Sequence, residues 1–527
     1  MPTLELYDTT LRDGAQTEGI SYSVADKLRI AQKLDELGIH YVEGGWPGSN
    51  PKDMEFFQQI KKCALKNARI CAFGATCRPQ LNPEKDTNIQ GLLKAETEIV
   101  TLFGKSSTLH VQYVLRTSLE ENLRMISSSV GFLKARGRKV IYDAEHFFDA
   151  AGDNLEYALK TLKAAQEAGA DLIVLCDTNG GMLTSSLVKL IKETRGKITI
   201  PLGIHAHNDS GMAVANSIAA VEEGCVQIQG TINGYGERCG NADLITCIGN
   251  LKLKLNIPCI SDAQLKKLTE TSRYISELSN MRHNSSQPFV GESAFAHKGG
   301  VHINAMVKHS RTYEHTNPAL VGNRSRFLVS ELSGRTSILL KAKQLELSLE
   351  KDTLYTKKIL KLLQKLEHQG YQFEAAEGSF ELLIQKTMKK YRNFFALEGF
   401  RVIIEKTKDG ALKSEATIKL TVNKIEEHTA AEGDGPVNAL DNALRKALVE
   451  FYPAIASMRL TDFKVRVLEE RAGTAAKVRV LIQSQDGKDT WNTIGVSENI
   501  IEASWQALVD SIEYKLLKDK KHPQFAP

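Results

Sequence analysis

Short apolar runs alternate with amphipathic stretches along the first half of the chain. The runs have the length of buried strands and span residues 4–7, 41–45, 69–74, 99–103, 139–142, 172–176, 201–204 and 226–231. Apolar residues recur at helical spacing in the intervening segments 24–37, 155–168, 183–193 and 212–222. Gly38, Gly169 and Gly224 stand where three of these helices are expected to end.

Eight strand–helix units within about 250 residues are the number and the size expected of a (β/α)8 TIM barrel. The alternative is a doubly wound open sheet. Such a sheet usually has fewer strands, and no G-x-G-x-x-G motif follows the first strand of this chain. The sequence therefore predicts the α/β fold class, with a TIM-barrel catalytic domain over residues 1–270.

The pattern changes beyond residue 255. Residues 262–278 predict a helix, and residues 282–292 predict a polar loop punctuated by Gly and Pro. Residues 324–372 form a charged, helix-forming stretch with a leucine repeat, typical of a connector packed on one face. We therefore predict a helical linker subdomain over residues 271–385.

The last part of the chain contains a weak internal duplication. Two strands and then a helix are predicted twice, at 402–406, 417–422 and 438–450, and again at 463–468, 477–482 and 500–516. We assign residues 386–527 to a C-terminal α+β domain of duplicated βββα type. It has no cluster of ligand-type histidines, so we expect it to bind a regulator or a partner subunit rather than to perform chemistry.

Composition narrows the functional classes. The chain has 527 residues and a net charge of only +5, which argues against a dedicated nucleic-acid surface. No apolar run approaches the length of a membrane span, and the N-terminus lacks the features of a signal peptide. The eight cysteines include no C-x-x-C pair, so we expect no disulfide framework and a cytoplasmic location.

Polar and ionisable residues cluster where six of the predicted strands end. They are DTTLRDG (8–14), EGGW (43–46), DAEH (143–146), DTN (177–179), HAHND (205–209) and NGYGERCGN (233–241). Barrel enzymes place their active sites at the carboxyl ends of the strands. This asymmetry predicts a site at that end of the barrel.

His205 and His207 lie two residues apart at the end of a strand, so their imidazoles can point to the same place. With the Asp13 carboxylate and the Asn241 carbonyl oxygen they would form a mixed oxygen and nitrogen site. Such a site suits Mn²⁺, Zn²⁺, Co²⁺ or Mg²⁺. Arg12, next to Asp13, could stabilise negative charge that develops on a substrate oxygen.

Several motifs give the chain a resemblance to a known family. DTTLRDGAQ (8–16), HAHND (205–209), GYGERCGNADL (234–244) and GESAFAHKGGVH (291–302) resemble motifs of the 2-isopropylmalate, homocitrate and citramalate synthases, and GDGPVNAL (433–440) resembles their allosteric domain. These metalloenzymes join acetyl-CoA to a 2-oxo acid. The resemblance covers essentially the whole chain and is greatest to the long citramalate branch, through EGGWPGSNPKD (43–53), FGATCRP (73–79) and DAEHFFDA (143–150).

The resemblance implies a role for each matching residue. The implied metal ligands are Asp13, His205, His207 and Asn241, the substrate-binding residues are Arg12, Gln16 and Thr178, and the catalytic residues are Arg12, Glu145, His302 and Tyr313. His302 and Tyr313 fall in the subdomain that completes the active site, usually that of the partner subunit in a homodimer. From position alone, Glu145 is as readily a structural carboxylate as a catalytic one.

The implied reaction condenses acetyl-CoA with pyruvate and hydrolyses the thioester to (R)-citramalate and CoA, the first step of a pyruvate route to isoleucine. Glu145 or His302 would remove the proton from the acetyl-CoA methyl group. Isoleucine is the expected feedback ligand, and Trp46 is consistent with a small substrate pocket. The alternatives are a 2-isopropylmalate synthase that uses 2-oxoisovalerate, a metal-dependent acyl-CoA lyase and a non-catalytic amino-acid sensor.

Overall fold

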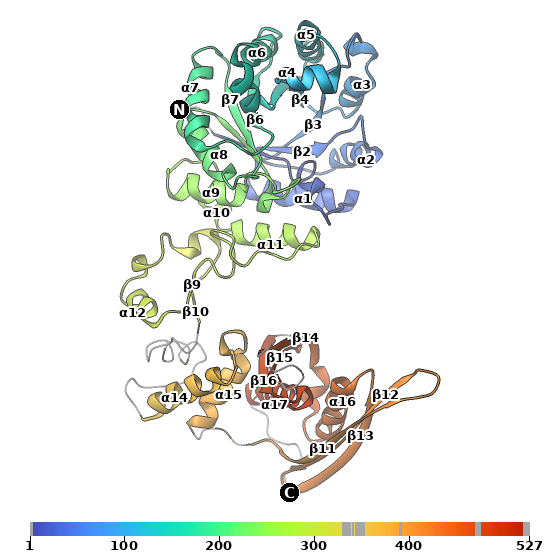
Figure 1. Cartoon of the computed structure of the whole chain (residues 1–527), viewed down its shortest axis with the longest axis vertical. Helices are drawn as coiled ribbons and strands as arrows, with labels where there is room; N and C mark the ends of the chain where they lie inside the picture. Colours follow the sequence, from blue (N-terminus) through green and yellow to red (C-terminus); the bar gives the residue numbers. More distant parts are fainter. Residues whose placement is uncertain are drawn as a thin grey trace. The chain divides into compact units, whose positions relative to one another are not determined.

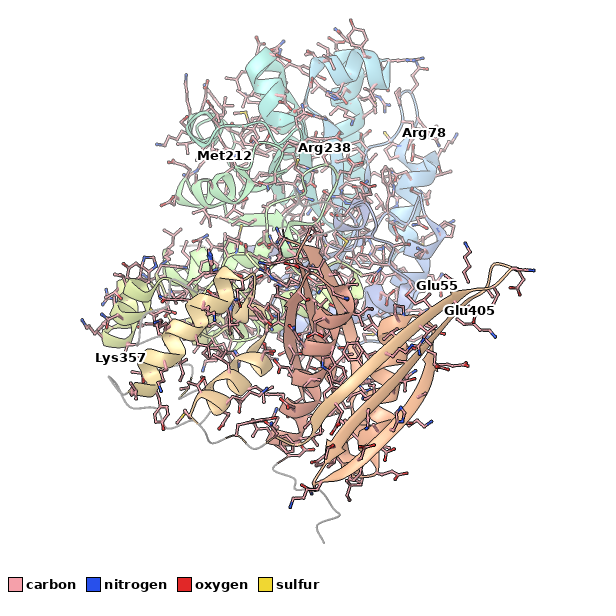
Figure 2. All side chains as sticks on the ribbon, turned by 60° about the horizontal axis from the view of Figure 1, so that its bottom comes forward. Glu55, Arg78, Met212, Arg238, Lys357 and Glu405 are labelled. Carbon is pink, nitrogen blue, oxygen red and sulfur yellow. The ribbon has the colours of Figure 1, made fainter. Side chains whose placement is uncertain are left out.

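The computed structural model describes residues 4–328, 354–388, 391, 393–468, 476–487 and 489–519, together with positions 339 and 342. Contacts between residues divide the chain into two compact units. The first unit comprises Met1–Phe295 and His315–Ser325, and the second comprises Ala296–Glu314 and Arg326–Pro527. Figure 2 draws the side chains of both and labels Met212 and Arg238 in the first and Lys357 and Glu405 in the second. The domain boundaries at 270 and 385 stay predictions.

Eight parallel strands of the first unit close into a barrel in the order of the chain (Figure 1). They are β1 (Glu5–Asp8), β2 (Tyr41–Gly45), β3 (Arg69–Ala75), β4 (Ile99–Lys105), β5 (Lys139–Glu145), β6 (Leu172–Asp177), β7 (Leu202–Ala206) and β8 (Gln227–Gly230). All eight coincide with the predicted runs. The largest difference is at β5, which ends at residue 145 instead of 142. The predicted TIM barrel is confirmed.

Helices surround the strands on the outside of the barrel (Figure 1). They are α1 (Val24–Leu37), α2 (Pro51–Ile60), α3 (Thr87–Lys94), α4 (Thr108–His110), α5 (Leu119–Ala135), α6 (Phe147–Glu167), α7 (Thr184–Arg195), α8 (Ala213–Glu222) and α9 (Leu244–Leu253), followed by α10 (Asp262–Leu265) and α11 (Leu268–Leu278). Within the described residues, no helix combines the length and the apolar character that a membrane span requires.

Local sequence sets the ends of α1. The Ser23 side chain accepts a hydrogen bond from the Asp26 amide, and the Asp26 side chain accepts one from the Ser23 amide, so two otherwise unpaired donors are satisfied. Gly38 ends the helix in the left-handed conformation, at φ 90°, which favours glycine. The predicted bounds of this helix, 24–37, are confirmed.

Two helices differ from their predictions. Helix α6 spans Phe147–Glu167, but Asn154 within it is non-helical (φ −153°, ψ 83°), so the stretch after this kink agrees with the predicted helix 155–168. The stretch before the kink was not predicted; His146 adopts the left-handed conformation (φ 58°) and turns the chain directly from β5 into it. The single helix predicted over 262–278 is divided into α10 and α11, with Lys266 and Lys267 between them.

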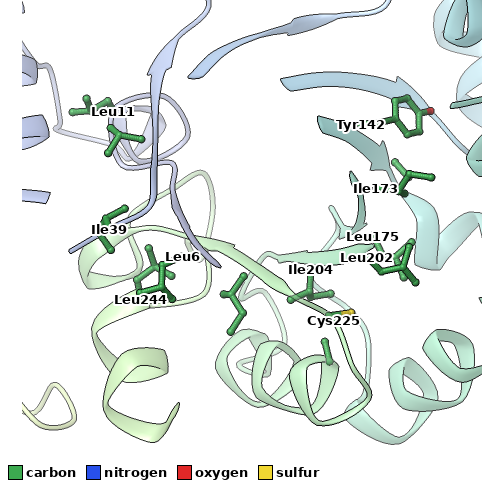
Figure 3. Packing of buried hydrophobic residues seen from close by; sticks show 14 of the residues in the cluster. Leu6, Leu11, Ile39, Tyr142, Ile173, Leu175, Leu202, Ile204, Cys225 and Leu244 are labelled. Carbon is green, nitrogen blue, oxygen red and sulfur yellow. The ribbon is translucent and has the colours of Figure 1, made fainter. Parts of the chain in front are cut away.

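Strand side chains alternate between two apolar clusters. In β6, Leu172, Val174 and Cys176 belong to the cluster inside the barrel. Ile173 and Leu175 belong to the larger cluster between strands and helices, part of which is drawn in Figure 3. Because the side-chain period of a strand is two residues, this alternation decides which side chains face the barrel interior.

The second unit begins with a short parallel pair, β9 (Ala296–His297) and β10 (Arg326–Phe327), and helix α12 (Gly300–Lys308). Helices α14 (Leu354–His368) and α15 (Glu377–Thr387) follow. The predicted connector over 324–372 is helical in α14. Most of its positions between 329 and 353 lie outside the described residues.

Two βββα repeats end the second unit. The first contains β11 (Ala396–Lys406), β12 (Leu412–Val422), β13 (Ile425–Gly433) and α16 (Pro436–Val449), and the second contains β14 (Arg459–Val467), β15 (Val478–Gln485), β16 (Thr490–Ser497) and α17 (Ile500–Lys518). Each three-stranded sheet is antiparallel, with α16 packed on β12 and β13 and α17 on β15 and β16. The duplicated α+β domain is confirmed, and the structure adds a third strand to the two predicted from each pattern.

The two units have separate apolar cores, which predicts separate responses to core substitutions. Leu444 of α16 is fully buried in the second unit and Ile204 of β7 in the first. We expect Leu444→Ala to lower the free energy of unfolding of the second unit by about 2–5 kcal/mol, because it leaves a cavity, and to leave the barrel unchanged. Calorimetry of the full chain measures this, with Ile204→Ala as the matched variant. A single transition shifted equally by both substitutions would contradict the prediction.

Candidate active site

A tight turn after β1 carries two charged side chains. The Asp8 carboxylate accepts hydrogen bonds from the Thr10 amide (2.9 Å) and hydroxyl (2.8 Å), and burial raises the pKa of Asp8 to about 7. Together these contacts fix the turn, so that Arg12 and Asp13 follow the carboxyl end of β1.

Asp13 lies next to two imidazoles from the end of β7. Leu202 and Ile204 pack in the outer cluster, so the alternation turns His205 to the barrel interior, and His207 follows two residues later. Asp13 Oδ2 is 3.4 Å from His205 Nε2 and 3.8 Å from His207 Nε2. All three side chains are buried, and their ligand atoms lie within 4.8 Å of one another. Three ligands of one metal ion have this spacing.

Asn241 reaches the same place from the loop after β8. It forms an isolated bridge with His207, and its Nδ2 donates to the Tyr235 carbonyl at 3.1 Å. Among the residues that the structure describes, its buried Oδ1 has no hydrogen-bond partner. A Cβ at Gly236 would lie 2.3 Å from Asn241 Nδ2, and φ there is +156°, so only glycine lets the loop close on Asn241.

These four side chains fit a divalent cation. One carboxylate, two imidazoles and one amide oxygen are a mixed donor set that suits several such ions. A buried carbonyl oxygen without a partner is unusual in a folded protein, and a bound cation would satisfy it. Asp13, His205, His207 and Asn241 remain the candidate metal ligands.

The charges of the cluster are strongly coupled. Burial opposes ionisation of Asp13, but Arg12 and the two imidazoles hold the pKa of Asp13 well below its usual range. Burial, and then the nearby His205, lower the pKa of His207 to about 4, so this imidazole is neutral at pH 7. For His205, the hydrogen bond and charge of Asp13 outweigh burial and raise the pKa, so a cation there competes with a proton.

Arg12 is fixed on three sides. Its Nε donates to Glu43 Oε1 at 2.5 Å, its Nη1 is 3.3 Å from Asp13 Oδ2, and its guanidinium carbon lies 3.8 Å from the centre of the Phe73 ring. Glu43 is fully buried and also accepts a hydrogen bond from Tyr7 Oη at 2.7 Å. Burial opposes the charge of Arg12, but Glu43 and Asp13 raise its pKa, so the guanidinium stays positive.

Three aromatic side chains, the aromatic wall, come from the ends of β2, β3 and β4. Trp46 meets Phe73 and Phe103 edge-on, with ring centroids 5.9 and 5.4 Å apart, and the two phenylalanines stack at 5.2 Å. Trp46 Nε1 donates to Asn88 Oδ1 at 2.5 Å, which anchors the indole.

One pocket of about 210 Å³ collects most of the predicted site residues. Those that line it are Arg12, Asp13, Gln16, Glu145, Thr178, His205 and His207, together with the aromatic wall, Asp143, Cys176, Glu237 and Arg238. Burial, and then Glu43, raise the pKa of Asp143 to about 7. The pocket is therefore charged on one side and aromatic on another.

Glu145 ends β5 and forms an ion pair with Lys105, its partner in the register of β4 and β5. The Thr178 hydroxyl oxygen, after β6, accepts a hydrogen bond from the His146 amide at 2.8 Å. Arg238 (labelled in Figure 2) donates to the Thr178 carbonyl at 2.8 Å and to both carboxylate oxygens of Asp209 at 2.7 and 3.0 Å. These bonds tie together the loops that follow β6, β7 and β8.

His302 and Tyr313 belong to the second unit. Their rings stack there with centroids 4.1 Å apart, and 46% of the Tyr313 surface is exposed. Their assignment to the active site stays a prediction.

Three pocket or network residues were missed by the sequence reasoning. Phe103 and Lys105 lie in the last three positions of β4, a strand end to which the sequence assigned no motif. Gln229 lies within β8. A signal was present: Gln227 and Gln229 are polar residues at alternate positions of an otherwise apolar strand, where both side chains must face the same way.

Three family descriptions match the chain. Residues 3–275 match the HMGL-like family, residues 289–370 the homocitrate synthase post-HMGL domain-like family and residues 374–516 the LeuA allosteric (dimerisation) domain. The chain is 57% identical to the (R)-citramalate synthase of Geobacter sulfurreducens over 99% of both chains, and 53% identical to that of Aquifex aeolicus over 98% of both. It is 32% identical to the 2-isopropylmalate synthase of Methanocaldococcus jannaschii, over 98% of this chain and 95% of the relative.

The geometry predicts that His207→Ala removes bound metal without unfolding the barrel. His207 lies just beyond β7, so its loss takes away a ligand and little of the apolar core. Metal content by mass spectrometry and the melting temperature measure the two effects. His110→Ala, a histidine outside the cluster, is the control and is expected to keep its metal. Full metal content in His207→Ala would refute this ligand assignment.

Proposed function

The chain belongs to the HMGL-like family and, within it, to the (R)-citramalate synthases, and we propose that it condenses acetyl-CoA with pyruvate to give (R)-citramalate and CoA. A base removes a proton from the methyl group of acetyl-CoA, and the methyl carbon attacks the 2-oxo carbon of pyruvate, whose oxygen takes up a proton. Water then cleaves the thioester to give the carboxylate and CoA. The observation that carries this conclusion is the full-length similarity, combined with a buried Asp13–His205–His207 cluster beside Arg12.

The enzyme is metal-dependent, and Asp13, His205, His207 and Asn241 are the proposed ligands. A divalent cation at this position supplies a Lewis acid for the 2-oxo group of pyruvate. Arg12 is held beside Asp13 by Glu43, so its guanidinium is positioned to bind the oxygen on which negative charge develops. Mn²⁺, Mg²⁺, Zn²⁺ and Co²⁺ all suit this donor set.

Thr178 and Gln16 are the proposed binding groups for the pyruvate carboxylate. Because Thr178 Oγ1 accepts the His146 amide hydrogen, its own proton can be donated to a carboxylate. Glu145 lines the pocket as the proposed base for the acetyl-CoA methyl group, and its ion pair with Lys105 fixes the position of the carboxylate. His302, with Tyr313 stacked on it, is the rival base from the second unit.

The aromatic wall suggests how the pocket could favour pyruvate among the oxo acids. The aromatic wall takes up the β2–β4 side of a pocket of about 210 Å³. We propose that the methyl group of pyruvate packs on this wall, where the larger isopropyl group of 2-oxoisovalerate would need more room.

A panel of 2-oxo acids tests the activity and its specificity. We expect kcat/KM to be highest for pyruvate and to fall by about 10–200-fold for each added methylene group that the pocket cannot hold. Release of CoA and the identity of the product measure this. A preference for 2-oxoisovalerate would indicate a 2-isopropylmalate synthase. Cleavage without condensation would indicate a lyase, and no turnover with any metal would favour an amino-acid sensor.

We propose that the C-terminal repeats bind isoleucine and join two chains into a homodimer. The match of residues 374–516 to an allosteric dimerisation domain supports this, as does the separate core of the repeats.

We also propose that the protein is located in the cytoplasm. All eight cysteines are free thiols, as is usual for a protein in a reducing compartment.

Isoleucine is expected to inhibit the full-length enzyme and to stabilise the second unit. A ligand that binds only the folded state raises stability by RT ln(1 + [L]/Kd), about 2.7 kcal/mol at a hundred times Kd. Calorimetry should therefore show a higher melting temperature for the transition that Leu444→Ala lowers. Leucine and valine are the matched controls. Inhibition by leucine alone would contradict the choice of ligand.

A further inference from the structure

A hydrogen-bonded chain crosses the barrel interior behind His205. His205 Nδ1 and Gln229 Oε1 are 3.1 Å apart, and Gln229 Nε2 donates to Asp143 Oδ1, also at 3.1 Å. His205 and Gln229 are register partners on β7 and β8, whereas Asp143 reaches Gln229 from β5, three strands from β8 around the barrel. Gln229 is fully buried, and Asp143 and His205 are 4% and 5% exposed.

The chemistry of the three side chains decides which group donates and which accepts in each of these two hydrogen bonds. Gln229 Nε2 faces Asp143 Oδ1 and donates to it, and an ionised Asp143 carboxylate can only accept this hydrogen bond. The amide oxygen then faces His205, and it can only accept. His205 Nδ1 must therefore carry a proton, which leaves Nε2, 3.4 Å from Asp13 Oδ2, as the nitrogen that can bind a metal ion.

We propose that Gln229 and Asp143 are positioning residues that hold His205 in the Nδ1–H form and aim its Nε2 at the metal position. This inference rests on the metal site of the proposed function. Without Gln229, the buried His205 Nδ1–H loses its acceptor, and the ring can rotate or change tautomer.

The simpler interpretation is that Gln229 only fills polar space inside the barrel. Gln227 provides the comparison, because it lies two residues earlier on β8, faces the same way and is also fully buried. Its Nε2 donates to Glu5 Oε2 at 3.2 Å, and Glu5 begins β1, far from its carboxyl end. A general role in packing predicts similar effects at positions 227 and 229, whereas a positioning role predicts an effect at 229 alone.

Calorimetric titration of the metal-free, full-length chain with Mn²⁺ tests the proposal without reference to turnover. We expect Gln229→Leu to raise the Kd for Mn²⁺ about 10–100-fold, which is typical of the loss of a group that orients a ligand. Gln227→Leu should leave the Kd unchanged, although both variants lose melting temperature. Equal affinity in wild type and Gln229→Leu would overturn the proposal.

The Asp143→Ala variant gives a second test, which remains available if Gln229→Leu does not fold. Without Asp143 the Gln229 amide can turn over, so the Kd for Mn²⁺ is expected to rise. The double variant should bind no more weakly than Gln229→Leu, because both residues act through the same ring. An unchanged Kd in Asp143→Ala, or fully additive losses in the double variant, would refute the positioning role of Gln229 and Asp143.

The same titrations separate this proposal from the proposed metal site. If the wild-type protein binds no Mn²⁺, both the metal site and the positioning role are wrong. If the wild-type protein binds Mn²⁺ and both single variants bind it equally well, only the positioning role is wrong.

Discussion

The alternation of side chains along eight parallel strands is the constraint on which the site depends. It turns His205 and Gln229 into the barrel. Ile204 and Ile228, the residues just before them on β7 and β8, point the other way and pack under the helices. A slip of β7 by one residue would exchange His205 for Ala206 and turn both candidate ligands, His205 and His207, out of the barrel. The closed sheet then brings together side chains more than a hundred residues apart in the chain, because every strand ends around the same axis.

Burial of charge makes a second demand on this end of the barrel. A buried ion is costly unless it has a partner of opposite charge and its hydrogen bonds are made. Arg12 has Glu43 and Asp13, and Glu145 has Lys105. Among the described residues, Asn241 Oδ1 has no such partner, and it lies beside the three other candidate ligands. A cation bound there would satisfy this oxygen, and the ion pairs already hold Arg12 and Glu145 in place before substrate binds.

The strands could be predicted because apolar runs bounded by polar loops leave little choice of register. The third strands, β13 and β16, were not predicted, because polar residues such as Glu426, His428 and Asn492 interrupt their apolar positions and leave no apolar run. The candidate metal ligands Asp13, His205 and His207 could be proposed from the sequence because they belong to motifs, and the structure brings the three side chains together. Gln229 could not, because its importance depends on Asp143, which only the closed barrel brings within hydrogen-bond distance.

The chemistry of position 229 leaves few alternatives to glutamine. The side chain there must accept from His205 Nδ1 and donate to Asp143 Oδ1, which lie on different strands. A glutamate would accept from the imidazole but would set a second carboxylate against Asp143, and a buried pair of like charges is unfavourable. A serine or threonine hydroxyl can donate and accept, but it is attached directly to Cβ and so is too short to reach both partners from β8. A carboxamide carries a donor and an acceptor in one plane, and this pairing transmits the direction of the Asp143 hydrogen bond to the tautomer of His205.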